Sequence, residues 1–369
     1  MTDVAADRRE GAGDPRDPAR KVLVARTDRL GDLVLSLPVF AYIKERRPRW
    51  EVHALVAREA VPLVENDPHV DAIWSEGHRS GDLERRLAAE RFDAAVLLLY
   101  RRELAQVLRR AGVRRRIGPL SKWSSWWLLN GGVWQARSRT GRHEWAYNLQ
   151  LAEKLAGRGG PWPEPRLHLS GAQEEIGRSF RAEFGLGRAP LVFVHPGSGG
   201  SALDWEPERF AAVVRLLTEA PPGEGVRTPR VFVTGGPQDH QALAQIAPLL
   251  PAGVVSLGGR YRLREFLGVL AAGDLMIAPS TGPLHMASAL GLSTLGLFAP
   301  APTMSPDRWG NRGELARSLV PPVDCPSRRN CLGEECLMFD CMTGIGVDAV
   351  VNAARELLVE RERRSASGP

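Results

Sequence analysis

Hydrophobic and polar positions follow two alternating patterns along most of the chain. Short apolar runs, such as those at 21–26, 51–57 and 92–99, are typical of strands buried on both faces. The stretches between them repeat apolar residues every three to four positions, and Gly31 to Pro48 is predicted to form one helix that ends before this proline. Alternating strands and helices of this kind predict parallel, doubly wound sheets in an α/β protein.

A Gly/Pro-rich stretch at about 157–173 interrupts this alternation and is predicted to be a linker. The sequence therefore predicts two Rossmann-like domains facing across a cleft, at 21–165 and 174–345, with an amphipathic C-terminal helix at 346–362. Residues 1–20 and the last few residues are polar and predicted to be disordered. Ligands of such sheets bind at the carboxyl ends of the strands, so the cleft is the predicted site.

The most informative stretch is 273–300, which predicts a strand, a tight turn, a helix and a second strand. The turn Ser280-Thr281-Gly282 places two hydroxyls and several backbone N–H groups at a helix N-terminus. A helix start of this kind holds phosphate, because free N–H groups and the helix dipole both favour negative charge. His285 follows about one turn later. The alternative is a helix capped by Thr281 with His285 packed in the core, and the turn alone leaves both open.

Three other positions follow predicted strands. Asp32 begins a helix, where it either stabilises the N-terminus through the dipole or removes a proton from a substrate hydroxyl. Gly197 and Ser198 belong to a glycine-rich loop that is either a phosphate cradle or an ordinary flexible loop. Asp239 either binds a ribose hydroxyl or caps a helix. The G-x-G-x-x-G fingerprint is absent from the N-terminal half, which argues against a nicotinamide dehydrogenase.

Positive charge is concentrated in one stretch. The net charge is +6, but residues 101–142 hold eleven Lys/Arg and one acid, so this stretch carries +10 and the rest about −4. Such a block predicts an anionic partner. Four interleaved tryptophans suit contact with a glycolipid at a membrane surface; the alternative is a solvated charged face with the tryptophans packed inside. No nucleic-acid module is recognisable, so nucleic acid is not a predicted partner.

The first 20 residues lack the apolar region of a secretory signal, and no apolar run approaches the ~18–20 residues that span a bilayer. The protein is therefore expected in the cytoplasm, with its cysteines reduced. The four cysteines lie within 17 residues, at Cys325, Cys331, Cys336 and Cys341. Their spacing lacks the Cys-x2-Cys pairs of zinc ribbons, so the sequence favours reduced thiols in a loop over structural zinc or an iron–sulfur cluster.

Taken in order, the stretches "KVLVARTDRLGDLVLSLPVFAYIKERRP", "HPGSGG", "DWEPERF", "VFVTGGPQD" and "APSTGPLHMASALGLSTLGLFAP" resemble glycosyltransferase family 9, the lipopolysaccharide heptosyltransferase family. The resemblance covers about Lys21 to Arg361. It implies a GT-B fold and an inverting, metal-independent transfer of a sugar, often heptose from ADP-heptose, to a lipopolysaccharide core or similar surface glycolipid. It also implies a general base at Asp32 and a donor diphosphate at 280–282, followed by His285.

Two positions depart from the family pattern. Many relatives have an aspartate where this chain has Ser280, which we interpret as a subfamily difference. The family's usual Lys-x-Trp-Pro is Leu203-Asp204-Trp205-Glu206 here, so the lysine that would neutralise the leaving diphosphate is missing. Arg26 and Arg29 are the predicted substitutes. Two alternatives therefore stay open: a transferase that uses another nucleotide sugar for a different surface glycan, and a non-catalytic nucleotide-sugar-binding protein.

The sequence thus predicts a nucleotide-sugar donor on the C-terminal domain and a phosphorylated glycolipid acceptor on the N-terminal domain, with no cofactor. Peripheral contact with the inner face of the cytoplasmic membrane is expected. The predicted donor-binding residues are Gly197, Ser198, Asp239, Ser280, Thr281, Gly282 and His285. The predicted acceptor-binding residues are Arg26, Arg29, Arg114, Arg115, Arg116 and Arg142.

Overall fold

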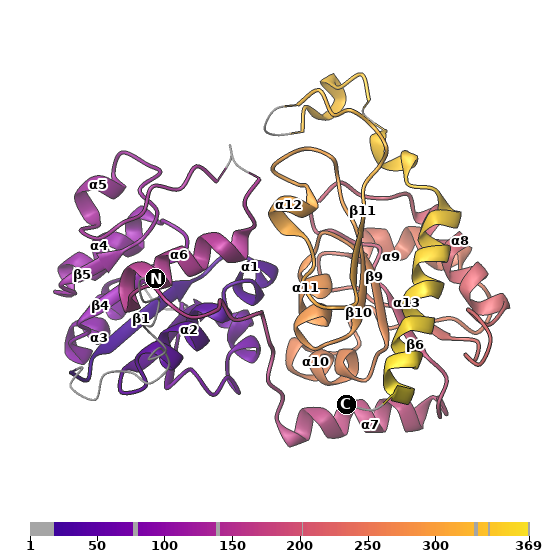
Figure 1. Cartoon of the computed structure of the whole chain (residues 1–369), viewed down its shortest axis with the longest axis horizontal. Helices are drawn as coiled ribbons and strands as arrows, with labels where there is room; N and C mark the ends of the chain where they lie inside the picture. The colour runs from indigo at the N-terminus through magenta and orange to yellow at the C-terminus, as the bar shows by residue number, and fades with distance from the viewer. Residues whose placement is uncertain are drawn as a thin grey trace, which may run out of the picture. The chain divides into compact units, whose positions relative to one another are not determined.

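The computed structural model describes residues 18–76, 80–137, 141–200, 202–327, 331–338 and 340–367. The predicted tail at 1–20 lies almost wholly outside these ranges. The described residues form two compact units, each built on one parallel sheet (Figure 1). Unit 1 runs to Ala136 and resumes at Glu144–Pro165, and unit 2 comprises Arg137–His143 and the chain from Arg166 onward. The short segment Arg137–His143 thus belongs to unit 2, although it lies inside the first predicted domain.

Unit 1 has a five-stranded sheet in the order β3-β2-β1-β4-β5, with every pair parallel. Its strands are β1 (Lys21–Arg26), β2 (Glu51–Ala57), β3 (Ala72–Glu76), β4 (Ala94–Leu97) and β5 (Arg115–Ile117). Its helices are α1 (Leu30–Val34), α2 (Pro38–Arg46), α3 (Ser80–Glu90), α4 (Arg102–Arg110), α5 (Ser125–Leu128) and α6 (Glu144–Ala156), with a 3-10 turn at Arg58–Leu63. Because helices cover both faces, the central strands β1 and β4 are apolar and buried along nearly their whole length.

The single helix predicted from Gly31 is two helices in the structure. α1 ends at Val34, and α2 begins with Pro38 in its first position. Proline has no N–H to donate to the preceding turn, so a continuous helix would be broken there. The Ser36 hydroxyl instead donates to the main-chain carbonyl of Asp32 at 2.7 Å. The break keeps α1 short and leaves Asp32 close to the carboxyl end of β1.

Unit 2 has a six-stranded sheet in the order β11-β10-β9-β6-β7-β8, again with every pair parallel. Its strands are β6 (Leu191–Val194), β7 (Arg230–Val233), β8 (Val255–Ser256), β9 (Leu275–Pro279), β10 (Ser293–Leu297) and β11 (Ala316–Leu319). Its helices are α7 (Gly171–Glu183), α8 (Pro207–Glu219), α9 (His240–Ile246), α10 (Leu263–Ala271), α11 (Gly282–Ala289), α12 (Pro306–Trp309) and α13 (Val347–Ser367), with 3-10 turns at Ala247–Leu249, Gly333–Glu335 and Cys341–Gly344.

Both sheets reverse their winding at one point, between β1 and β4 in unit 1 and between β6 and β9 in unit 2. At such a point the loops after the two strands diverge to opposite faces and leave a crevice in which ligands of doubly wound proteins bind. The segments that follow β1, β6 and β9 contain Asp32, Gly197 and Thr281. The fold therefore brings the main candidates to the two switch points.

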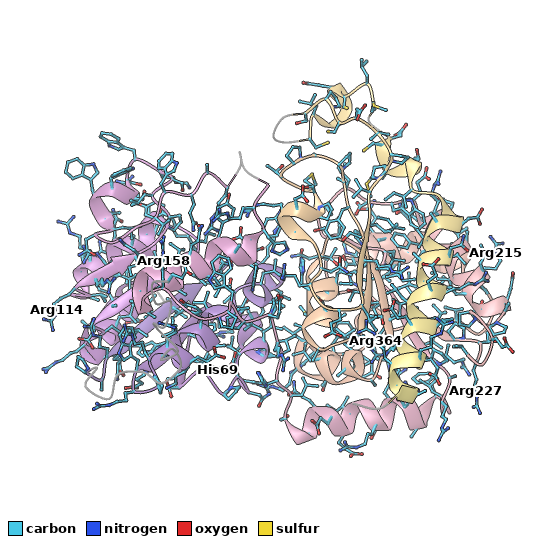
Figure 2. The ribbon with its side chains drawn as sticks, viewed as in Figure 1. His69, Arg114, Arg158, Arg215, Arg227 and Arg364 are labelled. Carbon is cyan, nitrogen blue, oxygen red and sulfur yellow. The ribbon has the colours of Figure 1, made fainter. Side chains whose placement is uncertain are left out.

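The C-terminal helix α13 extends to Ser367, beyond the predicted end at 362, so the prediction of a disordered chain end is wrong for residues 363–367. Arginines hold this last part. Arg361 donates to Asp274 Oδ1 (3.2 Å) and to the Gly291 carbonyl (3.0 Å). Arg364, labelled in Figure 2, pairs with Glu314 and Glu360. These contacts fix a polar stretch that composition alone assigns to a mobile tail.

Candidate active site

In unit 1 the candidate base Asp32 belongs to a buried cluster of charges at the carboxyl end of β1. Arg26, the last residue of β1, is only 3% exposed. Its Nε lies 2.6 Å from Asp28 Oδ1, its Nη1 lies 2.9 Å from Glu144 Oε1, and its Nη2 pairs with Asp32 Oδ1. Asn148 Oδ1 accepts a further bond from Nη1 at 3.4 Å. One guanidinium therefore holds three carboxylates.

Asp32 titrates close to neutral pH in this setting. Burial raises its pKa, Arg26 opposes the rise, and the charges of Asp28 and Glu144 add to it, which brings the pKa of Asp32 to about 6. For Arg26, burial alone would lower the pKa, but Glu144, Asp32 and Asp28 outweigh it and raise the pKa above its usual value. A carboxylate of this kind is ionised at pH 7.5, yet basic enough to accept a proton.

The three nitrogens of Arg26 are thus committed to partners inside unit 1, so its geometry suits positioning Asp32 rather than meeting a ligand at the surface. Arg29 differs, because it is exposed and precedes α1 as its N-cap residue. Arg101, which follows β4 across the switch point, donates to Thr27 Oγ1 at 2.7 Å. Arg29, whose charge acts on Asp32, and Arg101 are consequently exposed arginines at the same edge of the sheet as Asp32.

The structure does not bring Arg114, Arg115 and Arg116 to this edge. They lie where β5 begins, at the amino-terminal edge of the sheet, whereas Asp32 lies at the carboxyl edge. Arg115 donates to the Lys154 carbonyl at 2.6 Å, and Arg116 donates to the Leu128 carbonyl at 2.8 Å. Arg114 is exposed and projects from unit 1 (Figure 2). Two of the three arginines therefore bind the backbone, which the charge count could not reveal.

The four tryptophans of the basic stretch are exposed. Their exposed fractions are 58–81%, for Trp123, Trp126, Trp127 and Trp134. Trp126 and Trp134 lie together, with ring centroids 6.5 Å apart. The Tyr100 hydroxyl donates to Ser124 Oγ at 2.8 Å, which ties the start of α5 to the end of β4. The alternative in which these tryptophans pack inside is therefore wrong, and we call the four residues the tryptophan face.

In unit 2 the turn after β9 leads into α11, with Thr281 as its N-cap residue. The Thr281 hydroxyl is buried and has no hydrogen-bond partner, and His285 Nδ1, one turn later, is also buried and unpartnered. Burial, reinforced by the nearby His143, lowers the pKa of His285 to about 3, so this imidazole is neutral. Buried polar groups left without a partner each cost ~1–3 kcal/mol, and a hydrogen-bonding ligand at this helix start would remove that cost.

The loop after β6 is braced by Asp239. His195 Nδ1 lies 3.0 Å from Thr234 Oγ1, and its Nε2 lies 3.3 Å from Asp239 Oδ2. The Asp239 carboxylate also accepts the Gly236 N–H at 2.7 Å. Burial would raise the pKa of Asp239, but the His195 and backbone contacts lower it below its usual value. A Cβ at Gly197 would meet Asp239 Oδ1 at 2.2 Å, so only glycine fits where the two loops approach.

Asp239 is therefore engaged in holding two loops of unit 2, and Ser198 beside it is also engaged. Ser198 Oγ donates to the Ala202 carbonyl at 3.2 Å and accepts the Gly200 N–H at 3.3 Å. Gly199 and Gly200 both have positive φ, a conformation that glycine adopts without strain. The geometry gives a fixed glycine-rich loop beside the α11 helix start, which suits a phosphate cradle better than a flexible connection.

The family model of glycosyltransferase family 9 (heptosyltransferase) matches residues 81–332. The chain belongs to glycosyltransferase family 9. A Haemophilus influenzae protein named as a candidate glycosyltransferase is 29% identical over 325 residues, which cover 84% of this chain and 92% of that protein. The lipopolysaccharide core heptosyltransferase OpsX of the same organism is 21% identical over 290 residues, which cover 76% and 79% of the two chains.

Solved structures of family 9 proteins share the fold. Escherichia coli ADP-heptose lipopolysaccharide heptosyltransferase II matches with a TM-score of 0.75 at 21% identity, covering 93% of this chain and 99% of that one. A Veillonella parvula family 9 glycosyltransferase matches with a TM-score of 0.79 at 17% identity, covering 92% and 98%. The predicted GT-B type α/β fold with two parallel sheets, and the predicted glycosyltransferase activity, are confirmed.

Leu203, which stands where the family usually has a lysine, packs toward the interior of unit 2. Its side chain is partly buried against the core of that unit. Trp205 is buried, and its Nε1 donates to the Ile345 carbonyl at 3.2 Å. The segment thus contributes apolar contacts, and a charged side chain at 203 would have to leave the core.

Sequence reasoning missed a buried cation in unit 2. Arg308 lies on α12, which follows the carboxyl end of β10, the neighbour of β9, and it is buried. The segment with Arg142 and His143 contacts the same region, since His143 Nε2 lies 2.8 Å from the Gly310 carbonyl. Arg142 itself is exposed. The signal that could have found Arg308 is its place after a strand of the parallel sheet, where ligand-binding residues gather.

Proposed function

We propose that this family 9 enzyme transfers heptose from ADP-heptose to a lipopolysaccharide core or a similar phosphorylated glycolipid, with inversion at the anomeric carbon and no metal ion in the displacement. Family membership supports the class of reaction. The names of the heptosyltransferase relatives and a solved complex of E. coli WaaC with ADP support the donor. The observation that carries the proposal is the α11 helix start, where two buried polar atoms have no protein partner.

On the donor side, the diphosphate lies at the N-terminus of α11. Thr281 Oγ1 donates to a phosphate oxygen together with the first backbone N–H groups, and the helix dipole favours the same negative charge. His285, held neutral by burial, offers a hydrogen bond without adding charge. Arg308 supplies the cation that Leu203 does not. These groups stabilise the charge that develops on the leaving diphosphate.

On the acceptor side, Asp32 removes the proton from the acceptor hydroxyl as the oxygen attacks the anomeric carbon. The new bond joins acceptor oxygen and sugar, the bond to the diphosphate breaks, and the proton stays on Asp32. A pKa of about 6 suits this role, because the base is ionised before the reaction and can still hold the proton. Arg26 orients the carboxylate through its paired contact.

The tryptophan face and the exposed arginines of unit 1 support binding at an anionic membrane surface. Indole rings favour the boundary between lipid headgroups and hydrocarbon, and each Lys or Arg near an anionic bilayer contributes ~1 kcal/mol. The described residues include no helix that is long and apolar enough to cross a membrane. We therefore propose peripheral attachment at the inner face of the cytoplasmic membrane, with the glycolipid acceptor presented to unit 1.

Vesicle binding tests the attachment. The protein should co-sediment with phosphatidylcholine vesicles that contain phosphatidylglycerol, release at higher salt, and bind pure phosphatidylcholine weakly. Trp126→Ala with Trp127→Ala should reduce binding. Two exposed arginines at opposite sheet edges form a matched pair: Arg102→Glu should weaken binding about fivefold or more, at ~1 kcal/mol per charge, whereas Arg114→Glu should not. Equal effects of the two arginine changes would refute a surface centred on the carboxyl edge.

Two other functions remain candidates because Leu203 replaces the usual lysine: transfer of another sugar, and nucleotide-sugar binding without catalysis. Calorimetry with ADP, UDP and GDP separates the donors, and we expect ADP to bind most tightly. Mass spectrometry of a de-heptosylated lipopolysaccharide acceptor incubated with ADP-heptose should show one added heptose. Preference for UDP or GDP would overturn the donor assignment, and tight ADP binding without transfer or donor hydrolysis would favour the binding protein.

A further inference from the structure

The connection between β11 and α13, residues 320–346, holds all four cysteines of the chain and little regular structure. We call it the cysteine segment, and it projects beyond the sheet of unit 2 (Figure 1). Its described part contains two short 3-10 turns and neither a strand nor an α-helix. Leu337 is fully exposed and Leu332 is about half exposed, so the segment buries little apolar surface of its own. A stretch of this length without a core needs another source of order.

The fold brings the four thiols to one pocket. Leu203, Pro300 and Ala301 form part of its wall, and the sulfur-bearing residues that line it are Cys325, Cys331, Cys336 and Cys341. All four are partly buried, and none is joined in a disulfide. Cysteines gathered in one pocket can share a metal ion, which binds them as thiolates and releases their protons.

Two of the sulfurs already accept backbone N–H groups in the same geometry. The Gly333 N–H donates to Cys331 Sγ and the Met338 N–H donates to Cys336 Sγ, each at 3.4 Å and each from the residue two positions later. Gly333 has φ +61°, a conformation in which glycine is unstrained. Hydrogen bonds to sulfur of this kind stabilise thiolates and tune the metals that they bind.

We propose that the four cysteines bind one divalent transition-metal ion, zinc or iron, in a tetrahedral thiolate site that orders the cysteine segment. A ligand set made only of thiolates selects such ions over magnesium or calcium. In the described part of the chain, no three of these sulfurs lie within 4.8 Å of one another, whereas ligands around one zinc ion stand roughly 3.8 Å apart. Binding therefore draws the turns together, and it ties them to unit 2 through Leu203, which packs against the core.

The test uses the full untagged chain, purified in reducing buffer without added metal. Elemental analysis should find about one zinc or iron ion per chain. After chelation, cobalt should restore the site and give the visible bands of tetrahedral cobalt with a thiolate charge-transfer band. Zinc leaves the native protein colourless, whereas iron colours it without acid-labile sulfide. Chelation should also increase hydrogen exchange across 320–346 and leave unit 1 unchanged.

Variants locate the ligands. Cys331→Ser and Cys336→Ser should each lose most of the bound ion, while Leu337→Ala, a control at the fully exposed residue next to Cys336, should keep it. Three results would overturn the proposal: metal content near zero with no cobalt spectrum, acid-labile sulfide in stoichiometric amounts, or absence of titratable thiols in the unfolded protein, which means disulfides. The measurements on the unaltered chain decide the matter even if a serine variant does not fold.

Discussion

Replacing Asp32 by asparagine tests the candidate base through both catalysis and stability. The side chain keeps its shape, and its amide oxygen can still accept from Arg26, so the fold should persist. Transfer should fall by ~10²–10⁴-fold, the range for loss of a general base, with little change in donor affinity. In the unaltered enzyme, kcat/KM should rise with pH around a midpoint of about 6, the pKa of the buried carboxylate.

The stability effect follows from the same pKa. Folding raises the pKa of Asp32 from 3.8 to about 6. Protonation of this carboxyl group therefore stabilises the folded state relative to the unfolded state. That stability is present below pH 4 and is lost as the pH rises through 6. At ~1.36 kcal/mol per unit of pKa the full loss is about 3 kcal/mol, and about half of it develops between pH 5 and pH 8. The asparagine side chain does not titrate, so the variant lacks this pH dependence.

The assay is calorimetric melting of both proteins at pH 5 and pH 8. The Tm of the Asp32→Asn variant minus that of the unaltered protein should increase by roughly 3–6 °C between these pH values, at ~2–4 °C per kcal/mol for a domain of this size. Any pH-independent effect of weakening the contact with Arg26 cancels in this difference. A Tm difference that stays flat, or that shrinks with rising pH, would show that Asp32 does not titrate near 6, and normal turnover of the folded variant would remove it as the base.

Four further changes extend the test. Asp28→Asn removes a charge that raises the pKa of Asp32, so the midpoint of the kcat/KM profile should move to lower pH with turnover retained, and an unmoved midpoint would contradict the coupling. Thr281→Ala should weaken ADP binding about tenfold by calorimetry, because one charge-assisted hydrogen bond of ~1.5 kcal/mol is lost. Unchanged affinity would show that the diphosphate does not bind at this helix start. Arg308→Met should lower kcat more than Arg308→Lys does, and equal losses would argue against a role for its charge. Leu203→Lys should lower the Tm without raising activity, because the position packs against the core, and a gain in turnover would refute that reasoning.

The fold was predictable from the sequence because the strand signals and the helix signals both indicated the same α/β architecture. Apolar runs without alternation gave strands buried on both faces, and helical periodicity between them gave parallel sheets. The failures have local causes. Pro38 divides a helix that apolar spacing alone predicts as continuous. The last residues of α13 are polar, yet Arg361 reaches Asp274, a residue far away in the sequence. Such a contact is invisible to any window of neighbouring residues.

The sequence could place candidate positions that depend on following a strand, as at Asp32 and Thr281, but not those that depend on pairing between distant side chains. A count of charges treats every arginine alike, but the structure distinguishes them. Arg26 pairs with three carboxylates, Arg115 donates to a carbonyl at the end of α6, and Arg114 is exposed to solvent. These arginines differ in their surroundings because the order of the strands decides which side chains and carbonyls lie near each one. A guanidinium is buried only where carboxylates or carbonyl oxygens accept its hydrogen bonds. The leucine in place of the usual lysine at position 203 also fits its surroundings. Leu203 packs against the core of unit 2 and lines the pocket that holds the four cysteines. In our proposal the positive charge opposite the leaving diphosphate comes from another segment at the carboxyl edge of the same sheet. Buried Arg308 is the candidate, on α12, which follows β10, the strand next to β9.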